Sequence, residues 1–447
     1  MSLKISVVGT GYLGVTHAAC MAELGFEVIG VDVDPAKIKA LSAGKLPFHE
    51  PGLDRLLEKH VASGRLRFTT DYDEVASWAD VHFIGVGTPQ RADGHGADMR
   101  FVDASVTELA SRIRGKALIV GKSTVPVGTA RRLESIIGTH AHPDAQISLA
   151  WNPEFLREGF AVKDTMSPDR LVIGCTDAHS EETLRVVYAQ ALEANTPLIV
   201  TDFETAELVK VAANAFLATK ISFINSFAEV TETIGGDITV LADALGYDAR
   251  IGRKFLNAGV GFGGGCLPKD IRALQARTSE LGLTHTMGFL AEVDEINLRR
   301  RERVVRLART MLKDQLAGAQ IAVLGVTFKP DSDDVRDSPA LDIAVRLFNA
   351  GAEVSVYDPQ GNTNAASRFP RLNYAPDLAA AVRDADLVLL LTEWDEFKTL
   401  LPADLEPLVG ARKIIDGRNV LNRSVWEAAG WELVGMGQHY APLDGQL

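Results

Sequence analysis

Near its N-terminus the chain reads Lys4-Ile5-Ser6-Val7-Val8-Gly9-Thr10-Gly11-Tyr12-Leu13-Gly14, a short apolar run followed directly by a glycine-rich turn. The apolar run predicts a buried β-strand, and the residues after the turn have the apolar spacing of a helix. A second predicted strand, Glu27–Val31, delivers Asp32 twenty-three residues after Gly9. GxGxxG alone is weak evidence, but strand, turn, helix and acidic residue together predict a dinucleotide-binding βαβ unit.

Each part of this unit has a chemical task. The glycines let a pyrophosphate approach the backbone and the helix N-terminus. A carboxylate at Asp32 accepts hydrogen bonds from ribose hydroxyls and repels the 2′-phosphate of NADP, although Lys37 nearby weakens the second argument. The sequence therefore predicts NAD as the cofactor, with binding residues Gly9, Gly11, Tyr12, Leu13, Gly14, Asp32 and Lys37.

Further strand-like runs at Val81–Val86, Ala117–Gly121 and Ile147–Ala150 alternate with helical stretches, as in a doubly wound parallel sheet. Each run is followed by a polar turn, and these turns are residues 87–89 with Thr88, residues 123–126 with Thr124, and residues 152–158. Because open α/β sheets bind ligands at the carboxyl ends of their strands, we expect one shared cleft. The alternative, an ordinary strand-to-helix turn, stays open for Thr88 taken alone.

The segment between Thr205 and Gly235 contains neither proline nor glycine, and its apolar residues recur at helical spacing, which predicts one long helix. Lys210 and Asn214 are four residues apart and share one face of it. A helical lysine usually lies in solvent, but the apolar neighbours of Lys210 predict partial burial. A second helical region, at about residues 285–315, carries Arg299-Arg300-Arg301, which we interpret as a solvated face rather than a binding patch.

Four glycines surround a thiol in the segment Gly261-Phe262-Gly263-Gly264-Gly265-Cys266-Leu267-Pro268-Lys269-Asp270. A nearly bare backbone allows a ligand to come close, and Pro268 suits the start of a helix, which places Cys266 just before a helix N-terminus. The helix dipole and Lys269 would there favour the reactive thiolate. A cysteine considered without its neighbours is more often a small buried hydrophobe, but this flanking sequence favours a reactive site.

From Gln320 the opening pattern returns. Ile321–Gly325 predicts a strand, an apolar helix follows, and Glu353–Asp358 repeats the strand-plus-aspartate end of the first unit. Residues 326–330 lack the second and third glycines, so a pyrophosphate could not lie on this helix in the same way. Lys329, Arg336 and Arg418 near the predicted strand ends suit a different phosphorylated ligand, although surface salt bridges are the alternative for each of them.

Composition limits the function further. The 447 residues are 46% hydrophobic and 23% charged, which is typical of a globular protein of several domains. A net charge of −13 provides no basic face for nucleic acid or for an acidic membrane. No signal-like segment or membrane-length apolar run is seen, so we expect a cytoplasmic protein. Cys20, Cys175 and Cys266 have no metal-type spacing, and His140 and His142 have no third ligand in view, so we expect no metal.

In this order, the motifs identify the chain as similar to the nucleotide-sugar dehydrogenases. The resemblance covers nearly the whole chain, and its specific signals are residues 9–14, residues 152–159, the Lys210 and Asn214 pair, residues 261–270, and residues 328–330 with Arg336. It implies two Rossmann-like doubly wound parallel-sheet domains joined by a long central helix and a mainly helical middle domain. We expect domain boundaries of 1–203 for NAD binding, 204–316 for the helical part with the cysteine loop, and 317–447 for the nucleotide sugar.

The resemblance also implies an activity, the oxidation of a primary alcohol in two NAD-linked steps. Cys266 would attack the intermediate aldehyde, the thiohemiacetal would lose a second hydride to NAD, and water would release the acid from a thioester. Lys210 and Asn214 would stabilise the oxyanion. Asp270 and Glu154, with Thr124, would position and activate water. By the same resemblance Thr88, Thr124, Glu158 and Arg336 join the cofactor site.

The implied sugar and nucleotide site contains Glu154, Phe155, Leu156, Lys210, Asn214, Arg250, Lys254, Phe255, Leu256, Gly263, Phe328, Lys329 and Arg418. In the family, the arginine at the position of Arg250 comes from a partner subunit, so the resemblance implies a homodimer through the central helices. Gly265 departs from the family's common serine, and Leu267 stands where the UDP-glucose branch often has phenylalanine and the GDP-mannose branch has leucine. Residues 168–170 and 250–252 resemble the UDP-glucose branch, so we expect UDP-glucose as the substrate.

Other functions remain open from the sequence. GDP-mannose or another nucleotide sugar is the first alternative, because related sugars are distinguished by few contacts. A two-electron β-hydroxyacid dehydrogenase shares the first domain, the long helix and the lysine–asparagine pair, but it has no use for Cys266 or for a third domain. A sensor that binds NADH or a nucleotide sugar without turnover does not require intact catalytic residues.

Overall fold

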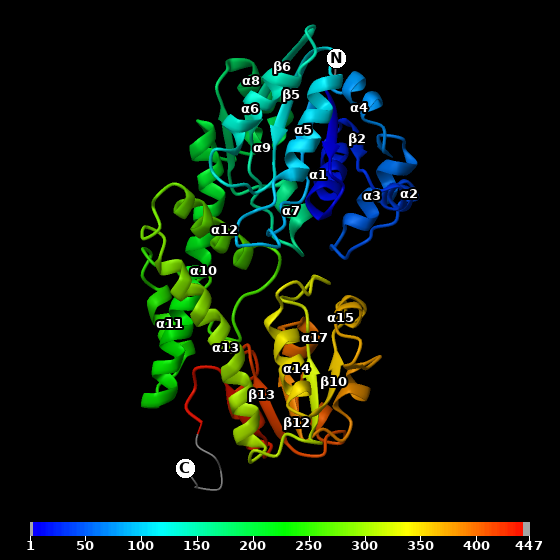
Figure 1. Cartoon of the computed structure of the whole chain (residues 1–447). Helices are drawn as coiled ribbons and strands as arrows, with labels where there is room; N and C mark the ends of the chain where they lie inside the picture. The colour runs from blue at the N-terminus through cyan, green and yellow to red at the C-terminus, as the bar shows by residue number, and fades with distance from the viewer. Residues whose placement is uncertain (1–2, 441–447) are drawn as a thin grey trace. The chain divides into compact units, whose positions relative to one another are not determined.

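The computed structural model describes residues 3–440. The chain divides into two compact units (Figure 1). The first holds the chain up to Ala213 together with Ala273–Leu283, and the second holds Asn214–Arg272 and the chain from Thr284 onward. Each unit is built on one sheet, which confirms the predicted α/β class with two Rossmann-like sheets. The three domain boundaries expected from the sequence stay a prediction.

The first sheet has the strand order β3-β2-β1-β4-β5-β6-β7-β8. Its strands are β1 (Lys4–Val8), β2 (Glu27–Val31), β3 (Leu66–Thr69), β4 (Val81–Ile84), β5 (Gly115–Gly121), β6 (Ala145–Trp151), β7 (Leu171–Cys175) and β8 (Leu198–Thr201). The strands from β1 to β6 are parallel, as predicted, but β7 pairs antiparallel with β6. The sheet therefore switches direction after the predicted part.

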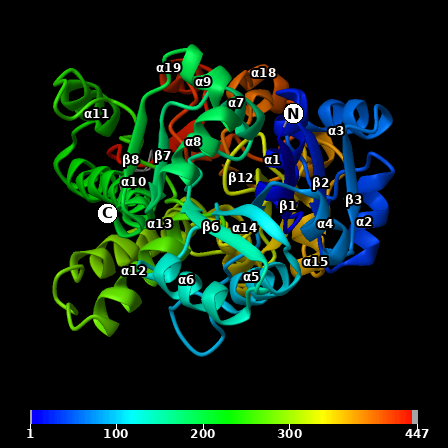
Figure 2. The same cartoon turned by 90° about the horizontal axis from the view of Figure 1, so that it is seen from above.

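Helices cover both faces of this sheet. They are α1 (Tyr12–Glu23), α2 (Pro35–Ser42), α3 (Leu53–Ala62), α4 (Tyr72–Trp78), α5 (Arg100–Arg112), α6 (Thr129–His140), α7 (Ala161–Met166), α8 (Ala178–Val187) and α9 (Ala189–Glu193). Figure 2 shows α1, α3 and α8 on one side of the strands and α5 and α6 on the other. Two separate apolar clusters correspond to the two faces, with Val7 and Phe83 in one and Val8 and Ile84 in the other. Alternate residues of one strand thus serve opposite cores.

The second unit contains a wholly parallel sheet in the order β11-β10-β9-β12-β13-β14. Its strands are β9 (Gln320–Leu324), β10 (Glu353–Tyr357), β11 (Asn373–Tyr374), β12 (Leu387–Leu390), β13 (Lys413–Asp416) and β14 (Glu432–Gly435). Its short helices are α14 (Pro339–Asn349), α15 (Asn362–Arg368), α16 (Leu378–Val382), α17 (Asp395–Lys398), α18 (Pro402–Leu405) and α19 (Arg423–Ala428). The predicted repeat of the opening βαβ pattern is confirmed.

Four further helices make the helical central region: α10 (Phe203–Ile234), α11 (Ile238–Gly246), α12 (Leu267–Glu280) and α13 (Phe289–Met311). The long helix α10 confirms the prediction for the segment from Thr205 to Gly235. Cys266 directly precedes α12, also as predicted. In the second unit Ile224 and Ala228 of α10 pack on Ile238 and Ala242 of α11, which fixes the turn between these helices.

The interpretation of Arg299-Arg300-Arg301 as a solvated face is wrong for two of the three residues. Arg300 is fully buried and Arg301 is 5% exposed. The Arg300 guanidinium donates to the Gly259 carbonyl oxygen at 3.2 Å and lies 3.4 Å from Glu232. Successive helical residues point about 100° apart, and both directions are covered here because α13 packs among acidic partners of the second unit.

Candidate active site

The glycine-rich turn after β1 brings the backbone of β1 and α1 into direct contact. A Cβ atom on Gly14 would lie 1.8 Å from the Gly9 carbonyl oxygen, so no other residue fits there. Gly9 has a φ of +89°, in the left-handed region. Gly11 is the N-cap of α1. Because glycine has no side chain, Gly11 does not cap the backbone N–H groups of the first turn, which begins with Tyr12 and Leu13. The turn thus fits the pyrophosphate of a dinucleotide, whose oxygens the backbone N–H groups would meet.

Asp32 follows β2 and is 8% exposed. Its Oδ2 accepts hydrogen bonds from the backbone N and Oγ1 of Thr10, at 2.8 and 2.9 Å, and from Lys37 Nζ at 2.8 Å. Burial opposes ionisation, but these bonds outweigh it and lower the pKa of Asp32. Among residues 3–440, Oδ1 accepts only from Asp34 N, at 3.1 Å, so this oxygen retains an acceptor site for a ribose hydroxyl.

The turns after β4 and β5 are tied together. Thr88 Oγ1 donates to the Thr124 carbonyl oxygen at 2.8 Å, and Ser123 Oγ donates to the Val86 carbonyl oxygen at 2.7 Å. Behind them the buried Glu207 accepts from Gly128 N and Ala130 N, at 2.6 and 2.7 Å, and so caps the start of α6. These contacts hold Thr88 and Thr124 at one edge of the sheet.

Glu154 and Lys210 form an ion pair inside the first unit, with Glu154 Oε1 3.0 Å from Lys210 Nζ. Lys210 is 5% exposed, which confirms the predicted burial of this lysine. The other carboxylate oxygen of Glu154 accepts from Leu156 N at 2.7 Å. The Phe155 ring lies 5.7 Å from Lys210 Nζ. The turn after β6 therefore presents a carboxylate beside a buried cation of α10.

Glu158 and Gly159 end the same turn, which the buried Glu50 holds in place. The Glu50 carboxylate accepts from Gly159 N at 2.6 Å and from Ala161 N at 2.7 Å. The Tyr12 hydroxyl donates to the same carboxylate. Burial and the Glu50 charge raise the pKa of Tyr12 far above its ordinary value, so this hydroxyl stays a donor. Glu50 thereby joins the first turn of α1 to the turn that carries Glu158.

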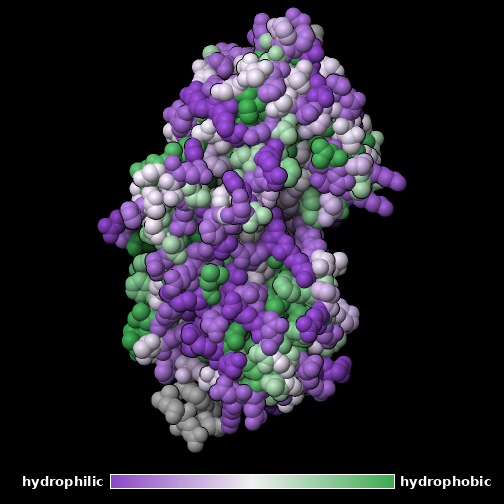
Figure 3. All heavy atoms as spheres, in the orientation of Figure 1, coloured by the Kyte–Doolittle hydropathy of each residue, from purple (hydrophilic) through white to green (hydrophobic). Residues whose placement is uncertain are grey.

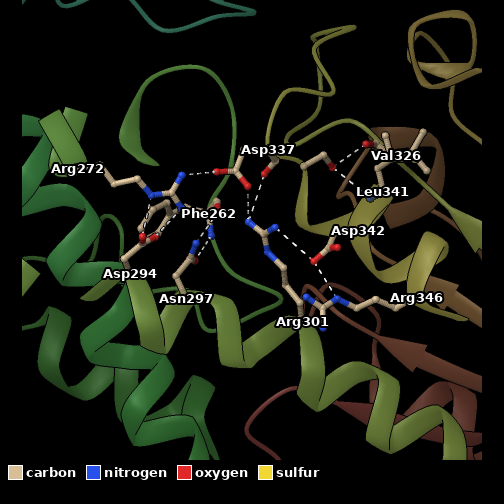
Figure 4. Close-up of polar contacts among 11 residues, drawn as sticks. Phe262, Arg272, Asp294, Asn297, Arg301, Val326, Asp337, Leu341, Asp342 and Arg346 are labelled. Atoms are coloured by element: carbon tan, nitrogen blue, oxygen red, sulfur yellow. Dashed lines mark hydrogen bonds and ion pairs between the residues drawn. The ribbon is translucent and has the colours of Figure 1, made fainter. Parts of the chain in front are cut away.

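The thiol loop belongs to the second unit and is held by its backbone. Figure 4 shows Asn297 of α13 facing Phe262, with Oδ1 accepting from Phe262 N at 2.6 Å and Nδ2 donating to the Phe262 carbonyl oxygen at 2.9 Å. Asn297 is fully buried. In the same loop, Gly264 N donates to the Arg336 carbonyl oxygen at 2.9 Å. The loop is thus fixed at two points, and Cys266 is exposed beyond them.

Charged residues surround this loop in Figure 4. Asp337 lies between Arg272 of α12 and Arg301 of α13, at 3.3 and 2.8 Å. Arg272 also pairs with Asp294 of α13 at 2.8 Å. Burial opposes the charge of Arg272, but Asp294 outweighs it and raises the pKa of Arg272. The network connects both helices beside the thiol loop to the segment that leads into α14.

Asp270 lies one helical turn after Cys266 and is 2% exposed. Its Oδ2 accepts from Asn214 Nδ2 at 2.6 Å, and its Oδ1 lies 2.8 Å from Lys269 Nζ. Asn214 comes from α10, one turn beyond Lys210 on the same helix. The structure thus places the Asn214–Asp270 pair within the second unit, one helical turn from Cys266.

The residues expected on the nucleotide side also lie in the second unit. The Phe328 ring packs so closely on Gly264 that a Cβ there would meet it at 2.8 Å. A Cβ on Gly265 would meet the Arg336 guanidinium at 2.5 Å, and one on Gly263 would meet the Asp337 carbonyl oxygen at 2.3 Å. Arg418 follows β13 and donates from Nε to the Leu391 carbonyl oxygen at 2.7 Å. Phe328, Lys329, Arg336 and Arg418 therefore share the strand ends of the second sheet with the glycine loop.

The remaining expected sugar residues follow α11. The Arg250 side chain is 89% exposed, and its guanidinium pairs with Asp248 at 2.6 Å. Lys254 is exposed, Phe255 has a φ of +66° and is 38% exposed, and Leu256 is buried. Of these residues Leu256 is thus held in a core, whereas the Arg250 side chain lies in solvent beside Asp248.

The comparisons with known proteins cover nearly the whole chain. Three domains of the UDP-glucose/GDP-mannose dehydrogenase family match it: the NAD binding domain at residues 3–192, the central domain at 204–299 and the UDP binding domain at 322–423. The chain is 41% identical to the UDP-glucose 6-dehydrogenase of Rhizobium meliloti over 98% of this chain and 100% of that protein. This chain belongs to the UDP-glucose/GDP-mannose dehydrogenase family.

Solved structures of similar proteins agree with this family. A UDP-glucose dehydrogenase from Pyrobaculum islandicum is 36% identical, with a TM-score of 0.89 over 98% of both chains. A GDP-mannose dehydrogenase from Pseudomonas aeruginosa is 29% identical, with a TM-score of 0.52 over 97% of this chain and 100% of that one. As a member of the family, the chain carries an NAD-binding domain and a UDP-binding domain, which confirms the NAD cofactor and a UDP-linked ligand.

Several buried polar residues of this family member were not identified from the sequence. Glu50, Lys122, Glu207 and Asn297 each bond to segments far away in the chain. The available signal was weak, a polar residue inside an otherwise apolar pattern. Across the part of the chain that the structure describes, no helix is long and apolar enough to span a bilayer.

Proposed function

We propose that this protein oxidises the primary alcohol of UDP-glucose to a carboxylate and forms two NADH for each sugar. The observation that carries the proposal is the exposed Cys266 at the start of α12, beside the buried Asp270–Asn214 pair, in the unit that holds the UDP-binding domain. UDP-glucose is supported over GDP-mannose because the similar UDP-glucose 6-dehydrogenase is 41% identical and the similar GDP-mannose dehydrogenase is 29% identical.

Bound NAD would accept the hydride in each oxidation. The chain's own residues supply the rest. In the proposal the Cys266 thiolate attacks the aldehyde carbon, because a thiol at a helix N-terminus is biased toward the charged, nucleophilic form. Lys210 and Asn214 stabilise the resulting oxyanion. One Asn214 N–H bonds to Asp270, which leaves its second N–H for the substrate.

Release of the product needs an activated water. Asp270, Glu154 and Thr124 are assigned to this step, because a thioester carbonyl is attacked by water only when a base removes a proton. The Glu154–Lys210 ion pair supports this role, since it holds the carboxylate in one orientation beside the buried cation. Removal of one oxyanion donor typically raises the activation free energy by about 2.7 to 4 kcal/mol. Lys210→Ala should therefore lower kcat far more than loss of a surface lysine does.

The proposal extends to a homodimer through α10. In the second unit, five large apolar side chains of this helix are exposed: Phe216 65%, Phe223 47%, Phe227 38%, Val230 49% and Ile234 72%. At about 100° per residue they fall on one stripe roughly 60° wide, an uncovered apolar face. Figure 3 shows hydrophobic side chains gathered at the edge where the second unit carries α10 and α11. A second copy would cover this face, and Arg250 would then reach the partner's sugar. A cytoplasmic location stays a prediction.

The test is the amount of NADH formed per sugar consumed. Two NADH from UDP-glucose, and little from GDP-mannose, are expected. Cys266→Ser should bind NAD normally and form no acid. Cys175→Ser, the matched control outside the loop, should bind NAD normally and form the acid. One NADH per sugar, or full acid formation by Cys266→Ser, would remove the covalent role of Cys266.

A further inference from the structure

A cavity of about 50 Å³ in the first unit is lined by both polar and apolar residues, among them Asn152, Pro153 and Glu154 of the turn after β6. Its inner wall is made by His17 of α1, Lys122 after β5, and Tyr188 between α8 and α9. Its outer wall includes Asp164, Asp169 and Arg170, of which Asp169 is exposed. The cavity thus connects the buried side of the turn that carries Glu154 with the surface before β7.

The inner wall holds more hydrogen-bonding groups than the protein satisfies. Lys122 is 8% exposed, and its Nζ donates to Asn152 Oδ1 at 3.0 Å. The Tyr188 hydroxyl donates to the same oxygen at 2.5 Å, and Asn152 Nδ2 donates to the Val172 carbonyl oxygen at 2.8 Å, which fixes the amide. An ammonium has three donors, and this is the one acceptor bonded to it within residues 3–440.

His17 adds two further unsatisfied atoms. It is 1% exposed, and neither of its ring nitrogens has a hydrogen-bond partner in the described part of the chain. Buried polar atoms of this kind are normally paired with protein or with water. A polar cavity holds a water when it has about 10 to 15 Å³ of accessible volume for it, so 50 Å³ accommodates a few molecules. Water in this volume would supply the missing hydrogen-bond partners.

The charges that face Lys122 come from several elements. They are Glu154 after β6 and Lys210 of α10. The charged Asp164, Asp169 and Arg170 and the neutral, titratable His17 and Tyr188 line the remaining walls. Burial lowers the pKa of Lys122 to about 8, while the Glu154 charge acts in the opposite direction. A lysine in this range gains and loses its proton near neutral pH, which an ordinary surface lysine does not.

We propose that the cavity is a water-filled proton relay in which Lys122 carries protons from Glu154 toward the surface at Asp169. The inference rests on the proposed function, because conversion of an alcohol to a carboxylate with two NADH releases three protons. In the relay the Glu154 carboxyl loses a proton to a cavity water, and that water protonates the neutral Lys122 amine. The ammonium then loses a proton to the outer water and to solvent, and no electron moves.

Three variants test the relay with UDP-glucose and NAD. Lys122→Met should lower kcat at pH 7 at least tenfold, change KM less than twofold, and enlarge the kinetic solvent isotope effect. Lys122→Arg keeps the charge and a donor to Asn152, but a guanidinium does not lose its proton. Its kcat should therefore be as low as that of Lys122→Met. Lys163→Met removes an exposed lysine of α7 outside the cavity and should match the wild type.

A role in holding Asn152 would give another pattern. Lys122→Arg would then restore kcat, and that recovery would overturn the relay, as would wild-type kcat and an unchanged isotope effect in Lys122→Met. NMR of the whole protein labelled with [ε-13C]lysine supplies a readout independent of turnover. One lysine should titrate near pH 8 and vanish in Lys122→Met. If that signal is present but the wild type forms no NADH from UDP-glucose, the proposed function is refuted, whereas the titration of Lys122 in the cavity is supported. If no such signal is present, the relay is refuted.

Discussion

Replacement of Asn297 by leucine should release the loop that carries Cys266. Leucine has nearly the same size, so packing is kept, but Phe262 loses the partners of both its N–H and its C=O. A buried backbone group left without a partner costs about 1 to 3 kcal/mol, and two such groups give about 2 to 6 kcal/mol. Since about 1.36 kcal/mol corresponds to a factor of ten, local opening should become at least roughly thirtyfold more frequent.

Amide hydrogen exchange read by mass spectrometry measures this opening directly, in a peptide that spans residues 259–266. The peptide should exchange at least about thirtyfold faster in Asn297→Leu, and kcat should fall because the thiol is no longer held. Asn364→Leu, which changes an exposed asparagine of α15, is the matched control and should leave this peptide unchanged. Wild-type exchange of the peptide in Asn297→Leu would refute the claim that Asn297 fixes the loop.

Three further outcomes are expected. Asp32→Ala should weaken the preference for NAD over NADP, measured as the ratio of kcat/KM values, and an undiminished ratio would remove Asp32 from cofactor selection. Arg250→Ala should raise KM for the nucleotide sugar at least about tenfold and leave the unfolding midpoint unchanged, because the side chain is exposed; unchanged KM would place the sugar elsewhere. Burial lowers the pKa of Lys122 to about 8, below its unfolded value near 10.5, so the unfolded state binds more protons between these pH values. In urea unfolding, the free energy of unfolding of the wild type should therefore rise by up to about 3 kcal/mol relative to that of Lys122→Met between pH 8 and 10.5. Parallel profiles of unfolding free energy against pH would contradict the buried charge.

Local signals were sufficient to predict much of the fold. The first strand and helix follow from an apolar run and a glycine turn, whose geometry depends on contacts a few residues apart, such as Gly14 against Gly9. The length of α10 follows from the absence of proline and glycine. By contrast β7 reads as a short apolar run like any other, and its antiparallel direction depends on pairing with β6 rather than on its own residues.

Buried polar residues mark the limit of prediction for the site. Lys210 was identified because its flanking residues on α10 are apolar. Lys122 was not, since its hydrogen-bond acceptor Asn152 and the Tyr188 ring that its ammonium faces are 30 and 66 residues away in sequence and converge only in the folded unit. Arg300 and Arg301 were misjudged for the same reason, because three adjacent arginines indicate solvent until acidic groups from other elements are placed around them.

The two strand-end aspartates show why similar βαβ units differ in function. Asp32 and Asp358 each accept from a threonine N–H and hydroxyl in the turn after the first strand of their sheet. Asp358, however, also accepts from Trp394 Nε1, and its other oxygen accepts from Gln360 N and Gly361 N at 3.0 and 2.7 Å.

Every oxygen of Asp358 is thus occupied by the protein, whereas Asp32 Oδ1 accepts from Asp34 N alone among the described residues. The second carboxylate therefore serves its own turn and has no acceptor left for a ribose. Since the second turn also lacks the glycines that admit a pyrophosphate, a nucleotide in the second unit has to be bound by side chains instead. We expect Phe328, Lys329 and Arg418, which follow β9 and β13, to be those side chains. On that expectation, one architecture serves an NAD binding domain in one unit and a UDP binding domain in the other.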